Sequence, residues 1–223
     1  MIEQVFASEN RNVTDEVIVP GKGRGLHVAM GLRDPFATEI EREASDIAGD
    51  SADSLSPGRD AVLDALWDDE RRAAQLLIYS HLETNARAGE PKGRRLVFDG
   101  DRSFLQTRDV DERHFEGEGE WGDPQTVVFL MACSTFEQKD LLSDFGISFH
   151  SAGAGAVVGT EAPVFSALLS LFAREVTRAW WGGVSLGEAI RAFRHRLLVG
   201  GNPLGFVFTL LGNADLRIKR SAV

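Results

Sequence analysis

Cysteine is nearly absent from this chain, since Cys133 is the only one among 223 residues. A single thiol cannot form an internal disulfide, and it cannot complete a zinc site built from several thiolates. The sequence therefore excludes a disulfide-rich secreted scaffold. It predicts a protein of a reducing compartment, and we expect the cytoplasm.

Long hydrophobic runs are missing as well. No uninterrupted apolar stretch approaches the roughly 20 residues that a membrane-spanning helix needs. The first ten residues, MIEQVFASEN, contain neither a basic cluster nor the apolar core of a leader peptide. We therefore expect a soluble protein that is not secreted and that has no membrane partner.

Basic charge is in deficit, with 24 lysines and arginines against 34 acidic residues and a formal net charge of −10. A negative field weakens attraction to phosphate backbones and to anionic lipid surfaces. The composition therefore argues against nucleic acid as a direct partner. An acidic surface serves solubility or draws in cationic ligands and basic peptide segments, and composition leaves both open.

The chain is long and apolar enough for one large core, with 43% hydrophobic residues. We expect a single domain over residues 1–223, in which residues 1–24 form an N-terminal extension or an edge hairpin. Short apolar runs predict strands, and apolar residues at helical spacing predict helices. The predicted strands are 26–32, 75–81, 126–133, 153–160 and 206–211, with a hairpin over 96–105 that turns at the pair Asp99-Gly100. The predicted helices are 34–47, 59–72, 137–149, 164–181 and 185–200, and residues 48–58 and 110–124 are predicted loops. In the first helix, Asp34 can act as the N-cap and Pro35 can occupy the first helical position. This alternation is typical of an α/β fold with a mostly parallel central sheet.

Two residues with useful chemistry stand at the ends of buried strands. His81 ends the run LIYSH, and Cys133 ends the run VVFLMAC. In open parallel sheets, ligands bind beyond the carboxyl ends of the strands, so neighbouring strands would bring these side chains to one crevice. An imidazole beside a thiol takes its proton or stabilises the thiolate, which is the attacking species. The pairing predicts nucleophilic catalysis by cysteine.

The chain resembles the caspase-like cysteine peptidases, and most closely their CHAT-domain branch. The resemblance is carried by LIYSH, VVFLMACST, GAGAVVGTEAPV, SLGEAIRAFRHRLL and NPLGFVFTLLGNADLRI, which occur in the order such domains show. It implies a caspase-like three-layer sandwich and a cysteine endopeptidase that uses no cofactor. It also implies a protein or peptide substrate, and regulation by an activating partner protein or a helical repeat domain, as in bacterial defence systems.

Carried over by position, the resemblance implies a catalytic dyad of His81 and Cys133. It implies an oxyanion site formed by the backbone N–H groups of Cys133 and of Leu82, the residue after the histidine. Relatives usually have glycine at that second position, and a leucine restricts the backbone angles that glycine permits. The resemblance further implies an acidic side chain that binds a basic substrate residue, for which Glu161 and Glu83 are the candidates. A binding or scaffold domain that has lost the chemistry is the alternative that Leu82 favours.

A rival motif, GVSLG at 183–187, matches the G-x-S-x-G pattern of serine hydrolases. Those enzymes need a strand before the serine, whereas a helix is predicted here. Ser185 and Glu188 instead have the spacing of a capping box that opens the last helix. The histidines show no metal-ligand spacing with one another or with Cys133, so no metal is expected.

Overall fold

A six-stranded sheet forms the centre of the computed structural model. The structure describes residues 16–19, 25–32, 34–56, 58–68, 72–85, 93–99, 103–113, 125–132 and 145–220. The strands of the central sheet lie in the order β10-β9-β8-β4-β2-β3. They are β2 (Leu26–Met30), β3 (Ala52–Leu55), β4 (Gln75–Tyr79), β8 (Val127–Met131), β9 (Ala156–Thr160) and β10 (Phe208–Gly212). All neighbouring strands are parallel except β9 and β10, which confirms the expected mostly parallel sheet.

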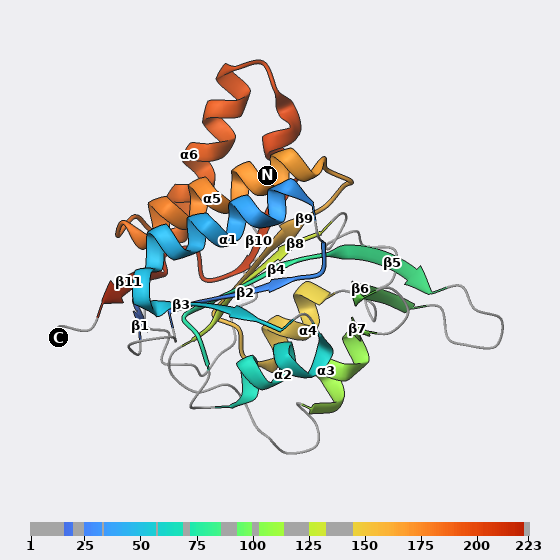
Figure 1. The fold of residues 1–223 in the computed structure, drawn as a ribbon. Coiled ribbons are helices and arrows are strands. Elements are labelled where there is room, and N and C mark those ends of the chain that lie inside the picture. Colours follow the sequence, from blue (N-terminus) through green and yellow to red (C-terminus); the bar gives the residue numbers. More distant parts are fainter. Residues whose placement is uncertain are drawn as a thin grey trace.

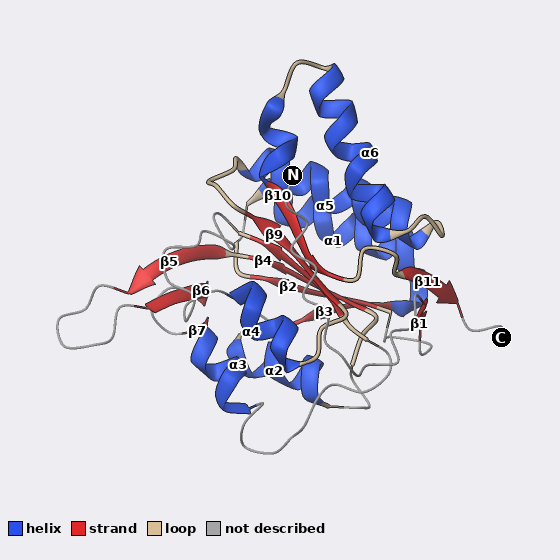
Figure 2. Cartoon of the chain, turned by 180° about the vertical axis from the view of Figure 1, so that it is seen from behind, coloured by secondary structure: helices blue, strands red, loops and turns tan. Residues whose placement is uncertain are grey.

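Helices cover both faces of this sheet (Figures 1 and 2). One face carries α1 (Pro35–Ala48), α5 (Ser166–Trp181) and α6 (Leu186–Val199), and the other carries α2 (Arg59–Trp67), α3 (Thr107–Arg113) and α4 (Phe145–Ala152). Each face has its own hydrophobic core. The molecule is therefore a three-layer α/β/α sandwich, as expected.

The two central strands β4 and β8 are buried along their whole length. Alternate side chains face opposite cores: Phe129 packs with α1, α5 and α6, whereas Leu130 packs with α2, α3 and α4. A strand covered on both sides needs apolar residues at every position, which explains the continuous run VVFLM. Each large side chain buried in this way stabilises the fold by about 1.5–3 kcal/mol.

The side chain of Asp34 caps α1 by accepting a hydrogen bond from the N–H of Ala37 at 2.9 Å, as the Asp-Pro start of this helix predicts.

Helices α1 and α5 are joined by a charged contact as well as by apolar packing. The buried carboxylate of Glu43 on α1 contacts the guanidinium groups of Arg174 and Arg178 on α5. These contacts fix the two helices side by side above the sheet.

Two smaller sheets complete the fold. The antiparallel strands β5 (His81–Asn85), β6 (Gly93–Asp99) and β7 (Ser103–Gln106) form one of them, and β6 and β7 confirm the hairpin predicted over 96–105. Asp99 pairs with Ser103, so the connection is residues 100–102, which are not described, and not a two-residue turn at Asp99-Gly100. The other sheet pairs β1 (Glu16–Val19) in parallel with β11 (Arg217–Arg220). Within residues 1–24, β1 is the part that the structure describes.

Several predicted boundaries were wrong. Residues 48–58 were expected to be a loop, but they contain the 3-10 turn Gly49–Ser51 and the edge strand β3, whose polar side chains hid it. The predicted loop 110–124 begins inside α3, where Val110 is fully buried. Helix α2 stops at Trp67, and a 3-10 helix, Pro203–Val207, precedes β10.

The remaining predicted strands and helices are confirmed with shifts of a few residues, as far as they are described. For the helix predicted over 137–149, residues 137–144 lie outside the described part, and α4 continues to Ala152. None of the helices in the described ranges is long and apolar enough to cross a membrane.

Candidate active site

Strands β4 and β8 lie next to each other and run in parallel, as the dyad hypothesis requires. Their register pairs Gln75 with Val127 and continues to Tyr79 with Met131, each β8 residue lying 52 positions after its partner. Beyond that pair, the backbone N–H of Ser80 donates to the carbonyl oxygen of Met131 at 3.3 Å. The two strands therefore stay paired up to the carboxyl edge of the sheet.

Cys133 lies outside the described residues. The last residue described on that side is Ala132, which is fully buried and packs in the core beneath α2, α3 and α4.

His81 is exposed and is the first residue of β5, where it pairs with Val97 of β6. The prediction that His81 ends the strand 75–81 was wrong by two residues, because β4 ends at Tyr79. At Ser80 the chain passes from the central sheet to the three-stranded sheet. Its buried hydroxyl donates to the carbonyl oxygen of Val97 at 2.7 Å, which joins the end of β4 to the three-stranded sheet. His81 therefore enters the second sheet at the carboxyl end of β4.

Leu82 is half-buried and packs against the core that contains α2, α3 and α4. It pairs with Leu96 across the β5–β6 ladder. The residue after the histidine therefore lies in a regular strand, and its side chain has a packing role.

Thr160, at the carboxyl end of β9, was not identified from the sequence. Its hydroxyl is fully buried and donates to the carbonyl oxygen of Ala132 at 2.8 Å. The β8–β9 ladder pairs residues only as far as Phe129 and Val158, although both strands continue beyond that pair. A side-chain hydrogen bond thus joins the strand ends where the backbone ladder has stopped.

Ser80 and Thr160 share a sequence signal that could have identified them. Each is a serine or threonine at the end of a buried, largely apolar run, LLIYS in one case and AVVGT in the other. Buried hydroxyls need partners, and at a strand end the nearest acceptors are the carbonyls of neighbouring strands.

Gly31, just after β2, makes room for this arrangement. A Cβ atom at Gly31 would lie 2.3 Å from the carbonyl oxygen of Val97 and 3.0 Å from the Ser80 hydroxyl oxygen. The N–H of Gly31 donates to the carbonyl oxygen of Tyr79 at 2.7 Å. The close approach of β2 to Ser80 and β6 therefore requires glycine at this position.

The two acidic candidates lie at different places. Glu161 is exposed directly after β9 and accepts a hydrogen bond from the hydroxyl of Thr209 at 2.6 Å. Glu83 is exposed on β5 and forms an ion pair with Arg95 of β6 at 2.9 Å. The positive partner offsets the charge of Glu83, so Glu161 is the better candidate for binding a cation.

Ser185 is a helix cap, as its spacing to Glu188 predicts. Its hydroxyl accepts from the N–H of Glu188 while the Glu188 carboxylate reaches back to Ser185. The hydrogen bond from the Ser185 hydroxyl, then the one from its backbone, and the nearby charge of Arg217 hold the pKa of Glu188 below its ordinary value. Helix α5 and a turn precede Ser185, so the strand that a serine hydrolase needs at this point is absent from the described segment 166–199.

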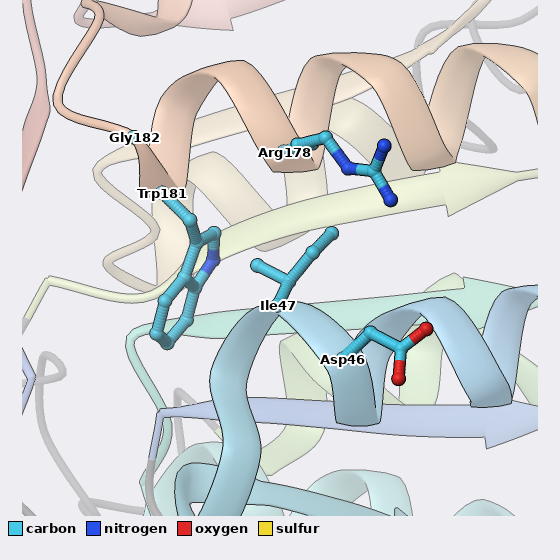
Figure 3. Close-up of a pocket in the computed structure, with 5 residues that line it drawn as sticks. All are labelled: Asp46, Ile47, Arg178, Trp181 and Gly182. Carbon is cyan, nitrogen blue, oxygen red and sulfur yellow. The ribbon is translucent and has the colours of Figure 1, made fainter.

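A shallow pocket of about 230 Å³ lies between the carboxyl ends of α1 and α5 (Figure 3). It is lined by Asp46, Ile47, Arg178, Trp181 and Gly182. The indole of Trp181 donates to the side chain of Gln75, the first residue of β4, so this pocket lies at the amino end of the sheet. It is therefore remote from His81. Within the part of the chain that the structure describes, no three His, Cys, Asp or Glu side chains are grouped so as to hold a metal ion.

Comparison with known proteins gives a family and a fold. The profile of the CHAT domain matches residues 8–203. The structure is similar to separase in the Saccharomyces cerevisiae separase–securin complex, with a TM-score of 0.58 and 13% identity, over 92% of this chain and 13% of separase. No curated protein matches the sequence.

Two further similar structures are gingipains. The Arg-specific cysteine proteinase gingipain R has a TM-score of 0.60 and 12% identity, over 89% of this chain and 48% of the proteinase. A structure of the complex of Porphyromonas gingivalis RgpB pro- and mature domains has a TM-score of 0.59 and 13% identity. The similarity covers 89% of this chain and 49% of the matched chain. The chain thus spans less than half the length of these relatives, and they establish a caspase-like fold.

Proposed function

This chain belongs to the CHAT domain family, and from that premise we propose that it is a cysteine endopeptidase acting through His81 and Cys133. The register of β4 and β8 is the observation that carries the proposal. Paired residues on these strands are 52 positions apart, and the same number separates His81 from Cys133. Neighbouring strands lie about 4.8 Å apart, so residues that leave two strands at the same level are within reach of one peptide bond.

In the proposed reaction the Cys133 thiol gives its proton to the His81 imidazole, and the thiolate attacks the substrate carbonyl carbon. The C–N bond breaks as the imidazolium protonates the leaving amine, which leaves a thioester on Cys133. Water then attacks the thioester, His81 takes its proton, and the carboxylic acid and the thiol are released. The backbone N–H groups of Cys133 and Leu82 would stabilise the oxyanion in both steps.

Glu161 is the proposed binding residue for a basic side chain next to the cleaved bond. It is exposed at the carboxyl edge of the sheet, directly after β9, the strand beside β8. Glu83 is the weaker candidate because it is paired with Arg95. An exposed ion pair contributes about 0.2–1 kcal/mol, so Glu161→Gln should lower kcat/KM for basic peptides by about fivefold or less and leave neutral peptides unaffected.

Hydrolysis of a fluorogenic peptide with arginine before the cleaved bond tests the proposal. Cys133→Ala should abolish cleavage, and His81→Ala should lower kcat by about 100- to 10,000-fold, the range for loss of a general acid–base group. His195→Ala, on the helix α6, is the matched control and should cleave at the wild-type rate. Undiminished cleavage by Cys133→Ala would end the proposal.

A binding domain that has lost the chemistry is the second candidate, and the strand position of Leu82 favours it. Leu82 packs into a core and pairs with Leu96, whereas a glycine would allow other backbone angles at this point. A thiol-directed probe distinguishes the two functions. A Cys133 that reacts no faster than a free thiol near neutral pH supports the binding domain.

Regulation by a protein partner is part of the proposal. One similar structure is a separase–securin complex, and another holds the pro- and mature domains of a gingipain. We expect low basal cleavage in the cytoplasm by a single domain, and a higher rate when an activating partner or helical repeat domain is bound. Titration of a candidate partner into the peptide assay measures that increase.

A further inference from the structure

We propose that Thr160 and Ser80 are positioning residues, whose buried hydroxyls hold the two peptide segments that lead to Cys133 and His81. The inference rests on the proposed function and adds to it two side chains that act through the main chain. Their role is to fix the main chain next to the dyad.

Thr160 acts on the cysteine side. Its hydroxyl donates to the carbonyl oxygen of Ala132, the residue directly before Cys133. The β8–β9 ladder has already ended at Phe129 and Val158, so among the described residues no strand pairing holds Ala132 to β9. Since the hydroxyl is fully buried, water does not compete for this bond. The bond therefore sets the position from which the chain continues to Cys133.

Ser80 acts on the histidine side. Its N–H donates to Met131 of β8, and its hydroxyl donates to Val97 of β6. The side chain is 2% exposed, so this residue joins three strands in a dry environment. His81 follows directly and pairs with the same Val97. Loss of the Ser80 hydroxyl would remove the hydrogen bond that holds β6 to the end of β4. Because His81 pairs with Val97 of β6, the position of His81 would then be less well fixed.

The chain offers a matched control for Thr160. The hydroxyl of Thr126 is also fully buried, and it donates to the carbonyl oxygen of Ala73 at 2.7 Å. Thr126 lies just before β8, at the amino end of the sheet, whereas Thr160 lies at the carboxyl end. Thr126→Val and Thr160→Val therefore remove the same kind of hydrogen bond from opposite ends of the sheet.

The experiment measures the alkylation rate of Cys133 by iodoacetamide as a function of pH. Because the chain has one cysteine, the rate reports that residue alone. Thr160→Val should slow alkylation near neutral pH and move the midpoint of the pH profile toward that of a free thiol, about 8.5. Thr160→Ser, which keeps the hydroxyl, should restore both. Thr126→Val should keep the wild-type profile, while its urea midpoint falls as far as that of Thr160→Val.

Peptide hydrolysis gives the second readout. Thr160→Val and Ser80→Ala should each lower kcat by about 10- to 100-fold with little change in KM, since a displacement of about 1 Å is enough for such a loss. Identical alkylation profiles for Thr160→Val and Thr126→Val would overturn the inference, even if Cys133→Ala abolishes cleavage. A wild-type protein that does not cleave peptides contradicts the proposed function instead, and the alkylation profiles still decide the role of Thr160.

Discussion

Substitution of Gly31 by alanine tests how tightly the strand end beside His81 is packed. The new Cβ atom would lie 2.3 Å from the carbonyl oxygen of Val97, and contacts shorter than 3.0 Å are essentially never observed. The backbones of β2 and β6 would have to separate by at least 0.7 Å. Overpacking of this kind lowers the free energy of unfolding by about 1–3 kcal/mol. Because Val97 pairs with His81, the same shift should lower kcat by up to about 100-fold.

Gly25→Ala is the matched control at the other end of β2. Its Cβ would lie 2.6 Å from the ring of Trp181 and 2.7 Å from the Cβ of Ser51, so it should be destabilised to a similar extent. Urea unfolding measures the stability of both variants, and peptide hydrolysis well below the unfolding transition measures kcat. Equal kcat values for the two variants would mean that the shift at β6 does not reach His81.

Two further predictions concern the helices. Glu43→Ala should lower the free energy of unfolding by about 1 kcal/mol, since it removes a carboxylate shared by Arg174 and Arg178, whose side chains are partly exposed, while Arg174 keeps its ion pair with Glu39; an unchanged midpoint in urea unfolding contradicts this. Ser185→Ala should cost about 1 kcal/mol at neutral pH through loss of the cap. A depressed pKa means that Glu188 stabilises the fold above its unfolded-state pKa, and that this contribution disappears as the pH falls through the folded-state pKa. The variant's deficit should therefore shrink in acid, and a deficit independent of pH opposes this account.

The sequence predicted the layers of the fold because burial leaves a pattern in it. Strand β8 is covered on both faces, so every position of Val127–Met131 is apolar. The Asp34 cap and the Ser185 capping box were predicted correctly because they depend on residues three positions apart in the chain. Strand β3 was missed because it lies at an edge and exposes Asp53 and Ser54, so it has no apolar run.

The candidate site could be predicted only in part. Strand order is a long-range property, so the sequence could only suggest that the strands leading to His81 and Cys133 are neighbours. The register of β4 and β8, whose paired residues are 52 positions apart, is consistent with that hypothesis. The sequence marks Ser80 and Thr160 only as hydroxyl residues at the ends of buried runs, whereas their acceptors, the carbonyl oxygens of Val97 and Ala132, lie on other strands and cannot be read from it. The partner of Glu83, Arg95, likewise became evident only once β5 and β6 were paired.

A crystal structure of the protein with a peptidyl inhibitor bonded to the Cys133 sulfur decides whether His81 and Cys133 form a dyad. In that structure Cys133 should leave the sheet beside His81, with a ring nitrogen of His81 within about 4 Å of the sulfur. A Cys133 that forms no adduct and packs among the buried side chains below Ala132, with the His81 ring turned away, would contradict it.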